Sequence, residues 1–278
     1  MVEFQLKPCF LTSNDIKTEY PLLIYLPGMD GTGELLRSQM VHLERGFDVR
    51  CLTIPKNDLS SWDILTRNVI DVIHAELEKS SHHHVYLCGE SFGGCLAMKI
   101  VTQSPHLFKR VILINPASSF QLQSLLTSVS QITNIIPSWL YDMGALGLLP
   151  FLASLSRISP RDRQELLKAM RSLPAETINW RLSLLREFRV EEEKLKQLDQ
   201  EVLLIAGAND SLLPSVREVE RLNYILPKAK NIILPDSGHA CLLEEDINLY
   251  EILQNHQFVE NINCNDYSSH ADKVKSVF

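Results

Sequence analysis

The residue of this chain best placed to do chemistry is Ser91, which has a glycine two positions before it and another two positions after it. The pentapeptide GESFG at 89–93 follows an apolar run of strand-forming residues, 85–88, and precedes a segment of helix-forming residues, 95–101. Glycine has no Cβ, so the backbones of a strand and a helix can meet closely around the serine. The pattern is typical of a nucleophile elbow, a strained turn that exposes the serine hydroxyl. The alternative is a glycine-rich turn that carries an ordinary serine.

A serine hydroxyl is a weak nucleophile until a histidine removes its proton and a carboxylate orients that histidine. After an elbow of this kind, the acid and then the histidine are expected further along the chain. His239 follows a predicted strand in a Gly-His turn, and Asp210 follows the predicted strand before it. Asp236 is a rival acid, but it lies only three residues before His239, and a solvated turn is the alternative for Asp210. We predict a catalytic triad of Ser91, Asp210 and His239.

The negatively charged oxygen that forms during acyl transfer requires two backbone N–H donors. One donor is expected from the residue after the nucleophile, Phe92, and the other from the loop after an earlier strand. The loop PGMDGTG at 27–33 follows an apolar run at 21–26 and supplies Met29 as the second donor. The alternative for the glycines of this loop is a tight turn without a catalytic role.

The elements that must position these residues alternate between apolar strand patterns and helical patterns, with no internal repeat. This alternation predicts a mostly parallel sheet with right-handed crossovers and helices on both faces. Helices are predicted at 35–42, from a capping box at 60–63 through residue 77, and at 244–255. The predicted strands are an edge strand at 4–11, buried strands at 21–26, 85–88 and 111–114, and further strands at 49–54, 202–206 and 231–234.

The domain organisation follows from a change of pattern in the middle of the chain. Residues 118–200 contain helix-like segments and no convincing strand, so we predict that they form a helical lid over the sheet. The core then consists of residues 1–117 and 201–259. Residues 260–278 are polar and aperiodic, and we expect them to form a flexible tail.

The composition of the chain restricts the classes of partner and the compartment that we expect. A net charge of -7 without a basic stripe argues against nucleic acid. The N-terminal residues show neither a secretory nor a transit pattern, so we expect a soluble protein or one whose targeting segment lies outside this sequence. The six cysteines show no C-x-x-C spacing, which favours free buried thiols in a reducing compartment. The histidines at 82–84 are expected in a solvated loop rather than a metal site. We predict no metal and no cofactor, an unspecified oligomeric state, and a cytoplasmic or plastid-type soluble compartment, with peripheral membrane attachment left open.

Four segments together resemble the α/β-hydrolase superfamily: LPGMDGTG at 26–33, CGESFGG at 88–94, NDSLLP at 209–214 and GHACLLEE at 238–245. More narrowly, residues 22–259 are similar to the hydrolase portion of the esterase/lipase/thioesterase-type phytyl ester synthases of photosynthetic organisms. The resemblance implies an α/β-hydrolase fold with a helical lid inserted after the sixth strand. It also implies Ser91 as nucleophile, Asp210 as acid, His239 as base, and fatty acyl groups as substrate.

The acceptor of the acyl group is either water or an alcohol such as phytol or diacylglycerol. In the plant enzymes a second, acyltransferase-like domain follows the hydrolase portion. This chain ends at Phe278 without such a domain, so esterase activity is expected more strongly than synthase activity.

The lid is strongly apolar at 132–140 and 143–155, yet these stretches are too short and too interrupted by Gly and Pro to span a bilayer. An apolar lid over a serine site suits a long acyl chain or transient contact with a membrane that holds one. The alternative is that these residues are core between lid and sheet. The predicted acyl-binding residues are Trp139, Leu148, Leu149 and Phe151.

The leading interpretation is a serine hydrolase that cleaves or transfers fatty acyl groups from lipid esters or thioesters. Other cofactor-free chemistry on the same fold, such as a haloperoxidase-like reaction, is a second interpretation. Haloalkane and epoxide hydrolases are disfavoured because they need an aspartate in place of Ser91. A non-catalytic binding protein is a third interpretation, disfavoured by the full triad.

Overall fold

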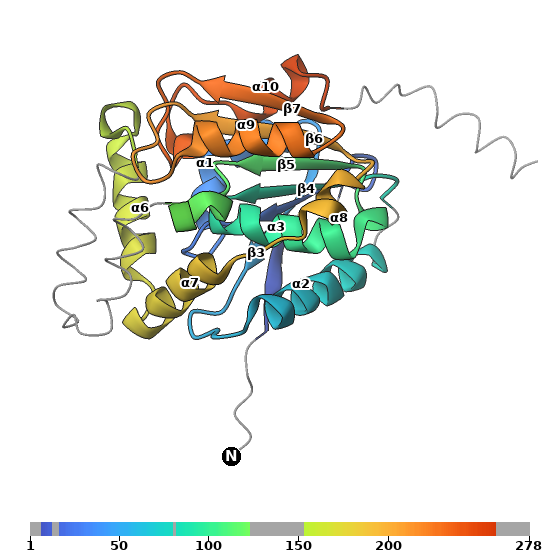
Figure 1. Cartoon of the computed structure of the whole chain (residues 1–278). Helices are drawn as coiled ribbons and strands as arrows, with labels where there is room; N and C mark the ends of the chain where they lie inside the picture. The colour runs from blue at the N-terminus through green and yellow to red at the C-terminus, as the bar shows by residue number, and fades with distance from the viewer. Residues whose placement is uncertain (1–6, 13–16, 80–81, 123–152, 260–278) are drawn as a thin grey trace, which may run out of the picture.

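A seven-stranded sheet lies at the centre of the computed structural model, which describes residues 7–12, 17–79, 82–122 and 153–259 (Figure 1). Its strands lie in the order β1-β3-β2-β4-β5-β6-β7. β1 is antiparallel to β3, and all other neighbouring pairs are parallel, so the mostly parallel sheet is confirmed. The strands are β1 Cys9–Thr12, β2 Leu22–Leu26, β3 Asp48–Thr53, β4 Val85–Glu90, β5 Arg110–Ile114, β6 Glu201–Gly207 and β7 Ala229–Leu234.

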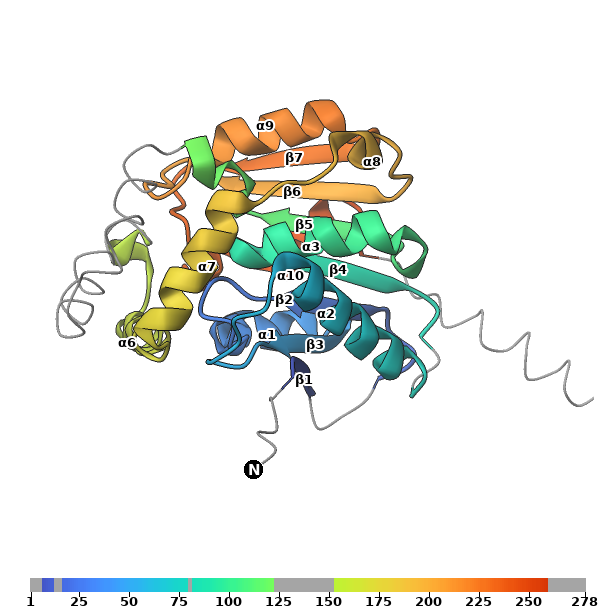
Figure 2. The same cartoon turned by 60° about the horizontal axis from the view of Figure 1, so that its bottom comes forward.

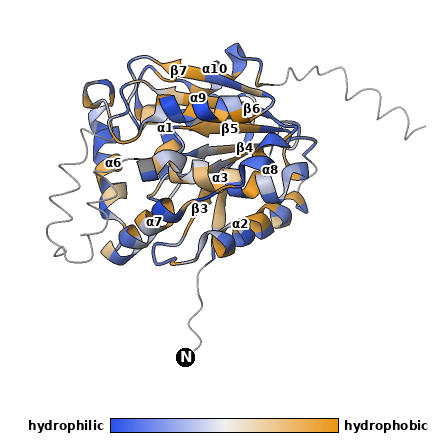
Figure 3. Cartoon of the chain, in the orientation of Figure 1, coloured by the Kyte–Doolittle hydropathy of each residue, from blue (hydrophilic) through white to orange (hydrophobic). Residues whose placement is uncertain are grey.

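Helices cover both faces of this sheet (Figures 1 and 2). α2 (Trp62–Leu77), α3 (Phe92–Gln103) and α9 (Ser215–Ile225) pack on one face, and α1 (Arg37–Leu43) and α10 (Leu249–Asn255) pack on the other. Figure 3 shows apolar colours along the strands and mixed colours along the helices. The sheet is therefore the apolar middle layer of three layers, as buried parallel strands require.

The central strand β2 shows why the strands are continuous apolar runs. Leu22, Ile24 and Leu26 point into the core on one face of the sheet, and Leu23 and Tyr25 point into the core on the other. All five side chains are at most 1% exposed. Successive strand residues alternate between faces, so a strand with helices on both sides is apolar at every position.

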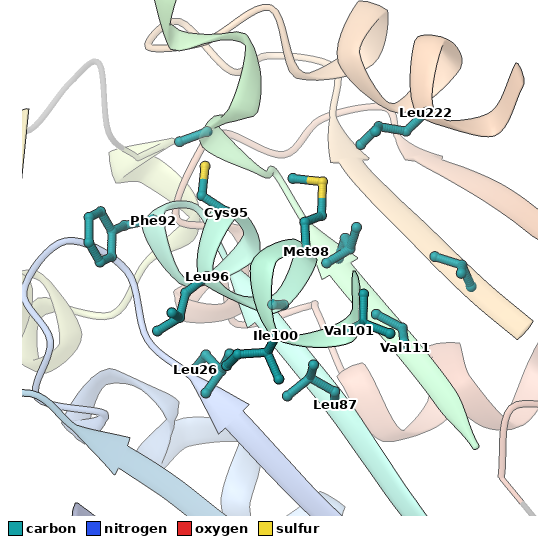
Figure 4. Close-up of a cluster of buried hydrophobic side chains, with 14 of the residues drawn as sticks. Leu26, Leu87, Phe92, Cys95, Leu96, Met98, Ile100, Val101, Val111 and Leu222 are labelled. Carbon is teal, nitrogen blue, oxygen red and sulfur yellow. The ribbon is translucent and has the colours of Figure 1, made fainter. Parts of the chain in front are cut away.

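Helix α3, which follows the elbow, is embedded in the larger core cluster (Figure 4). Its residues Leu96 and Ile100 lie beside Leu26 of β2 and Leu87 of β4, and all four are fully buried. Close packing on all sides leaves such a helix little freedom to move. The start of α3 is consequently a rigid platform for Ser91.

The segment between β5 and β6 is helical in its described part. It contains η3 (Ala117–Leu122), η5 (Leu155–Arg157), α6 (Pro160–Arg171), α7 (Ala175–Glu187) and α8 (Glu192–Lys196). Ser159 caps α6 by accepting a hydrogen bond of 3.1 Å from the N–H of Asp162, and Pro160 occupies its first turn. α6 and α7 lie at the left of Figure 1, at the edge of the sheet where the parallel strands end.

Two expectations differ from the structure, and one helix was not expected. The helical segment follows β5, the fifth strand rather than the sixth among the described residues, because a single edge strand precedes β2. The helix predicted at 244–255 begins only at Leu249, because Glu244 has an extended backbone and pairs with Ile158. Helix α9 was not predicted. Among the described residues, no helix is both long enough and apolar enough to cross a membrane.

Candidate active site

The turn between β4 and α3 holds Ser91 in a conformation that side chains rarely adopt, with φ of 54° and ψ of -114°. A Cβ at Gly89 would lie 2.4 Å from the carbonyl oxygen of Gly93. A Cβ at Gly93 would lie only 2.1 Å from the carbonyl oxygen of Leu26. Both flanking positions therefore require glycine, and the strained turn that the sequence predicts is present.

Ser91, His239 and Asp210 come from three different loops and form one chain of hydrogen bonds. His239 Nε2 lies 2.8 Å from Ser91 Oγ, and His239 Nδ1 lies 2.7 Å from Asp210 Oδ2. An ionised carboxylate can only accept, so we assign the proton of the neutral imidazole to Nδ1, which leaves Nε2 to accept from the serine. The imidazole is 6% exposed and the carboxylate 1%. The structure thus brings the three predicted residues together, with the imidazole and the carboxylate largely shielded from solvent.

The hydrogen bonds that Asp210 accepts favour its ionised form. Its Oδ1 accepts hydrogen bonds of 2.9 and 3.0 Å from the N–H groups of Leu212 and Leu213, and its Oδ2 also accepts from the Ser215 hydroxyl. Burial alone would raise the pKa of this carboxyl. The charge of His239 and the hydrogen bonds outweigh burial and lower the pKa below its ordinary value. Asp210 therefore remains an anion that can orient and stabilise the imidazole.

A second carboxylate acts on His239. Burial alone would lower the pKa of His239, but the charge and hydrogen bond of Asp210, and then the charge of Glu90, raise it above its ordinary value. Glu90 directly precedes Ser91 and accepts a hydrogen bond from the Tyr25 hydroxyl. Burial raises the pKa of Glu90, against the opposing effects of that hydrogen bond and of His239. Glu90 was not predicted as a site residue, although a charged residue at the end of an apolar strand was a visible signal.

The loop that carries His239 is held by Glu244, whose side chain is fully buried. The N–H of Gly238 donates to Glu244 Oε1 at 2.8 Å, and Arg157 Nε donates to Glu244 Oε2 at 2.9 Å. The rival acid Asp236 has a side chain that is 72% exposed, and its Oδ2 lies 3.8 Å from Arg157 Nη1. Asp236 is therefore a surface residue of this loop, and Asp210 is the carboxylate that contacts the histidine.

Asn115, directly after β5, connects the loop that carries His239 to the end of β6, the strand before Asp210. Its Nδ2 donates to the carbonyl oxygen of His239 at 2.7 Å, and its Oδ1 accepts from the N–H of Gly207 at 2.8 Å. The residue is fully buried and has a φ of 41°, a left-handed value that asparagine tolerates better than most residues. Asn115 was not predicted as a site residue. Its position at the end of a buried strand was the only signal in the sequence.

The loop after β2 borders the nucleophile. A Cβ at Gly28 would lie 3.8 Å from Ser91 Cβ, so Gly28 is next to the nucleophile in space. Met29 follows Gly28 in the chain, and Phe92 follows Ser91. Within the described ranges, the N–H groups of Met29 and Phe92 donate no hydrogen bond to another protein group. The structure thus places the loop that contains Met29 beside the nucleophile, and the oxyanion role of Met29 and Phe92 stays a prediction.

The remaining predictions concern the lid residues, the tail, metal sites and the cysteines. The predicted acyl-binding residues Trp139, Leu148, Leu149 and Phe151, and the tail 260–278, lie outside the described residues. The described part of the chain contains no group of three or more His, Cys, Asp or Glu side chains that could hold a metal ion. The free thiols are buried at Cys51, Cys88, Cys95 and Cys241 and exposed at Cys9.

The solvated loop expected for the histidines at 82–84 is wrong for His82, whose side chain is fully buried. Its Nδ1 lies 3.0 Å from the carbonyl oxygen of Tyr20, and its Nε2 lies 3.3 Å from Asp48 Oδ2. The cause is the parallel pairing of β2 with β3 and β4, which brings the residues before β4 against the starts of β2 and β3. This end of the sheet is opposite the edge that carries Ser91.

Known proteins resemble this chain in sequence and in fold. The family model described as alpha/beta hydrolase fold matches residues 21–246. Phytyl ester synthases 1 and 2 of Arabidopsis thaliana, both chloroplastic, are 32% and 28% identical over 84% and 85% of this chain. The chain spans only about a third of their lengths, 36% and 38%. The esterase EaEST of Exiguobacterium antarcticum superposes with a TM-score of 0.71 at 15% identity, covering 90% of this chain and 94% of that one.

Proposed function

The chain belongs to the α/β-hydrolase fold family, and from this membership we propose that it is a carboxylic ester hydrolase that works through an acyl-serine intermediate. The observation that carries the proposal is the unbroken chain from Asp210 through His239 to Ser91, with contacts of 2.7 and 2.8 Å. This arrangement converts a weakly nucleophilic hydroxyl into an attacking group, because the proton has a base within hydrogen-bond reach.

In the acylation half-reaction, Ser91 Oγ attacks the carbonyl carbon of the ester while His239 Nε2 takes the hydroxyl proton. The carbonyl oxygen becomes an oxyanion, which accepts hydrogen bonds from the N–H groups of Phe92 and Met29. The imidazolium is stabilised by Asp210 and by the charge of Glu90. It then protonates the leaving alcohol, and the tetrahedral species collapses to the acyl-serine.

In the deacylation half-reaction, water takes the place of the leaving alcohol. His239 Nε2 removes a proton from the water as its oxygen attacks the acyl carbon, and the same two N–H groups bind the second oxyanion. The imidazolium returns the proton to Ser91 Oγ as the carboxylic acid leaves. The enzyme ends in its starting protonation state, so the cycle requires no cofactor.

The substrate class that we propose is a fatty acyl group bound as a lipid ester or thioester. The names of the two plant relatives refer to esters of a long-chain alcohol, and the lid sequence at 132–140 and 143–155 is strongly apolar. Trp139, Leu148, Leu149 and Phe151 are proposed to contact the acyl chain. Transient contact of the lid with a membrane would give access to substrates of this kind.

A second candidate is transfer of the acyl group to an alcohol, which would form a phytyl or glycerolipid ester. The similarity to phytyl ester synthases over more than four fifths of the chain, 84% and 85%, favours it. Hydrolysis and transfer share the acyl-serine and differ only in the group that attacks it. The same site can therefore support both reactions.

The acyl-serine proposal is tested by labelling with a fluorophosphonate, which reacts with an activated serine and mimics the tetrahedral intermediate. We expect a single label on Ser91 in the folded protein, no label in Ser91→Ala, and full labelling in the control Ser183→Ala, whose serine lies in α7 outside the proposed site. Labelling of Ser91→Ala at another serine would place the nucleophile elsewhere and refute the proposal.

The substrate class is tested with a series of p-nitrophenyl esters from acetyl to palmitoyl. Each buried methylene contributes up to about 0.8 kcal/mol, so kcat/KM should rise by up to about fourfold per methylene until the site is full. Leu148→Asn and Phe151→Asn should flatten this rise and leave acetyl ester hydrolysis in place. A preference of the unmutated protein for acetyl over octanoyl esters would contradict a fatty acyl site.

A further inference from the structure

Arg181, in the middle of α7, joins the helical segment between β5 and β6 to the loop that borders the nucleophile. The residue is only 2% exposed. Its Nη1 donates to the carbonyl oxygen of Met29 at 2.6 Å, and its Nη2 donates to the carbonyl oxygen of Pro55 at 3.2 Å. One guanidinium thus links α7 to the loops that follow β2 and β3, although Met29 and Arg181 are 152 residues apart in the chain.

This guanidinium is buried without a carboxylate in direct contact. Within the described ranges, no Asp or Glu oxygen lies within 4.0 Å of Arg181, although Asp30 and Asp58 act on it electrostatically. Burial is costly for a charged group unless its donors are satisfied. Hydrogen bonds from a charged donor are about twice as strong as those between neutral groups. Arg181 makes two such bonds, both to main-chain carbonyl groups. The buried charge is therefore used to hold backbone rather than to pair with an acid.

The loop is shaped around the guanidinium. A Cβ at Gly31 would lie 2.6 Å from Arg181 Nη1 and 3.1 Å from Nη2, so a side chain there would displace the arginine or the loop. Gly31 has a φ of 69°, and its N–H donates to the carbonyl oxygen of Gly28 at 3.0 Å. Both peptides that flank Met29 are therefore held. The carbonyl of Gly28, in the peptide before Met29, accepts from Gly31, and the carbonyl of Met29, in the peptide after it, accepts from Arg181.

We propose that Arg181 is a positioning residue that fixes the N–H of Met29 for the oxyanion formed at Ser91. This inference rests on the proposed function, because it assigns a role within the same reaction. Fixing both peptides that flank Met29 sets the direction of its N–H, and an oxyanion donor is effective only when it is already oriented before charge develops. The oxyanion site is then built jointly by the sheet core and by α7.

The test compares Arg181→Met, Arg181→Lys and the control Thr177→Val. Thr177 lies one turn earlier on α7, is also buried, and donates from its hydroxyl to the carbonyl oxygen of Lys56 at 2.6 Å, so it anchors the helix without contacting the Met29 loop. For hydrolysis of one ester, we expect Arg181→Met to lower kcat by about 10- to 100-fold, less than the 100- to 1000-fold typical of losing a donor outright. KM should change less than about threefold.

Lysine keeps the charge but presents a single point donor rather than a planar fork, so Arg181→Lys should recover part of the lost kcat. Affinity for an alkyl boronic acid, which becomes tetrahedral on Ser91, should fall in parallel with kcat in both variants. Thr177→Val should keep kcat and boronate affinity within about twofold of the unmutated protein, because it removes an anchor of α7 without touching the Met29 loop.

Several outcomes overturn the inference. Unchanged kcat in folded Arg181→Met would remove Arg181 from the reaction, and an equal fall in Thr177→Val would mean that general docking of α7 is what matters. A rise in KM with unchanged kcat would make Arg181 a substrate-binding residue instead. If Arg181→Met does not fold, Arg181→Lys carries the same test. Absence of any ester hydrolysis by the unmutated protein would refute the proposed function itself, so the two failures are distinguishable.

Discussion

At the scale of single residues, the candidate site depends on His239 having two different neighbours. Its Nδ1 is held by Asp210, and its Nε2 is thereby directed at Ser91. Neither contact is useful alone, because an unoriented imidazole has no fixed tautomer and an unactivated serine is a weak nucleophile. The three residues are expected to act as one unit, with losses that do not add.

The first prediction follows from this unit. Ser91→Ala, His239→Ala and Asp210→Asn should each lower kcat for ester hydrolysis by about 10⁴-fold or more, with melting temperatures that confirm a folded protein. The double variant Ser91→Ala/His239→Ala should be no worse than Ser91→Ala alone. Near wild-type turnover in Asp210→Asn would assign the acid to another residue.

The second prediction concerns pH. His239 must be neutral to accept a proton, and a raised pKa keeps it protonated to higher pH. A plot of kcat/KM against pH should therefore rise through an apparent pKa above the ordinary histidine value of about 6.5. In Asp210→Asn the largest cause of the increase is removed and burial remains, so the rise should move to lower pH and level off at a smaller rate.

The matched control for this profile is Asp236→Asn, because Asp236 lies on the histidine loop but has a side chain that is 72% exposed. That variant should keep the midpoint of the unmutated protein. An equal shift in both variants would mean that general charge, rather than the Asp210 contact, sets the pKa of His239.

At the scale of elements, the strands were predictable because burial on both faces leaves a continuous apolar run, as in β2, β4 and β6. The triad was predictable because each member follows a predicted strand: Ser91 comes directly after β4, and Asp210 and His239 lie in the loops after β6 and β7. Two contacts that hold the site could not be predicted. Arg157 binds Glu244, which is 87 residues away in the chain, and Arg181 binds the carbonyl of Met29, which is 152 residues away. No local pattern reports a pairing at that distance.

The helix predicted at 244–255 was wrong at its start for the same reason. Its helical pattern is real from Leu249 onward. Glu244, however, is engaged by Gly238 and Arg157, and those tertiary contacts hold it in an extended conformation. Tertiary contacts routinely override local propensity in this way.

The third prediction tests those contacts. Glu244→Gln keeps the shape of the side chain but removes the charge that pairs with Arg157, so it should lower the free energy of unfolding by about 1–3 kcal/mol. It should also lower kcat, because the histidine loop loses an anchor. The neighbouring variant Glu245→Gln, at an exposed position, should change stability by less than about 0.5 kcal/mol. Urea denaturation and ester hydrolysis measure both effects, and equal stability of the two variants would contradict the anchor.

At the scale of the whole molecule, the parallel sheet gathers the functional loops at one edge, because parallel strands all end on the same side. The loops after β2, β4, β6 and β7 carry Met29, Ser91, Asp210 and His239 respectively. The helical segment between β5 and β6 then adds Arg157 and Arg181 to the supports of this edge. In the proposed reaction, this helical segment therefore lies where it could influence whether water or an alcohol reaches the acyl group on Ser91.

The fourth prediction concerns that attacking molecule. Water is present at about 55 M, so an alcohol competes only if the site excludes water and holds the alcohol in line, where effective molarities can greatly exceed that value. A long alcohol would gain affinity from burial of its own chain against the proposed apolar lid. We therefore expect hydrolysis in water alone and a smaller amount of ester product when phytol or diacylglycerol is supplied in liposomes.

The measurement is the ratio of ester product to free fatty acid as the alcohol is titrated, with Ser91→Ala as the background. Short alcohols such as methanol provide the control, because they attack equally well chemically but bury little apolar surface. A ratio that rises with phytol at concentrations where methanol has no effect supports binding of the acceptor alcohol. A ratio that stays at zero makes the protein a plain esterase, and the complete absence of free acid would make it an obligate transferase and the proposed hydrolysis wrong.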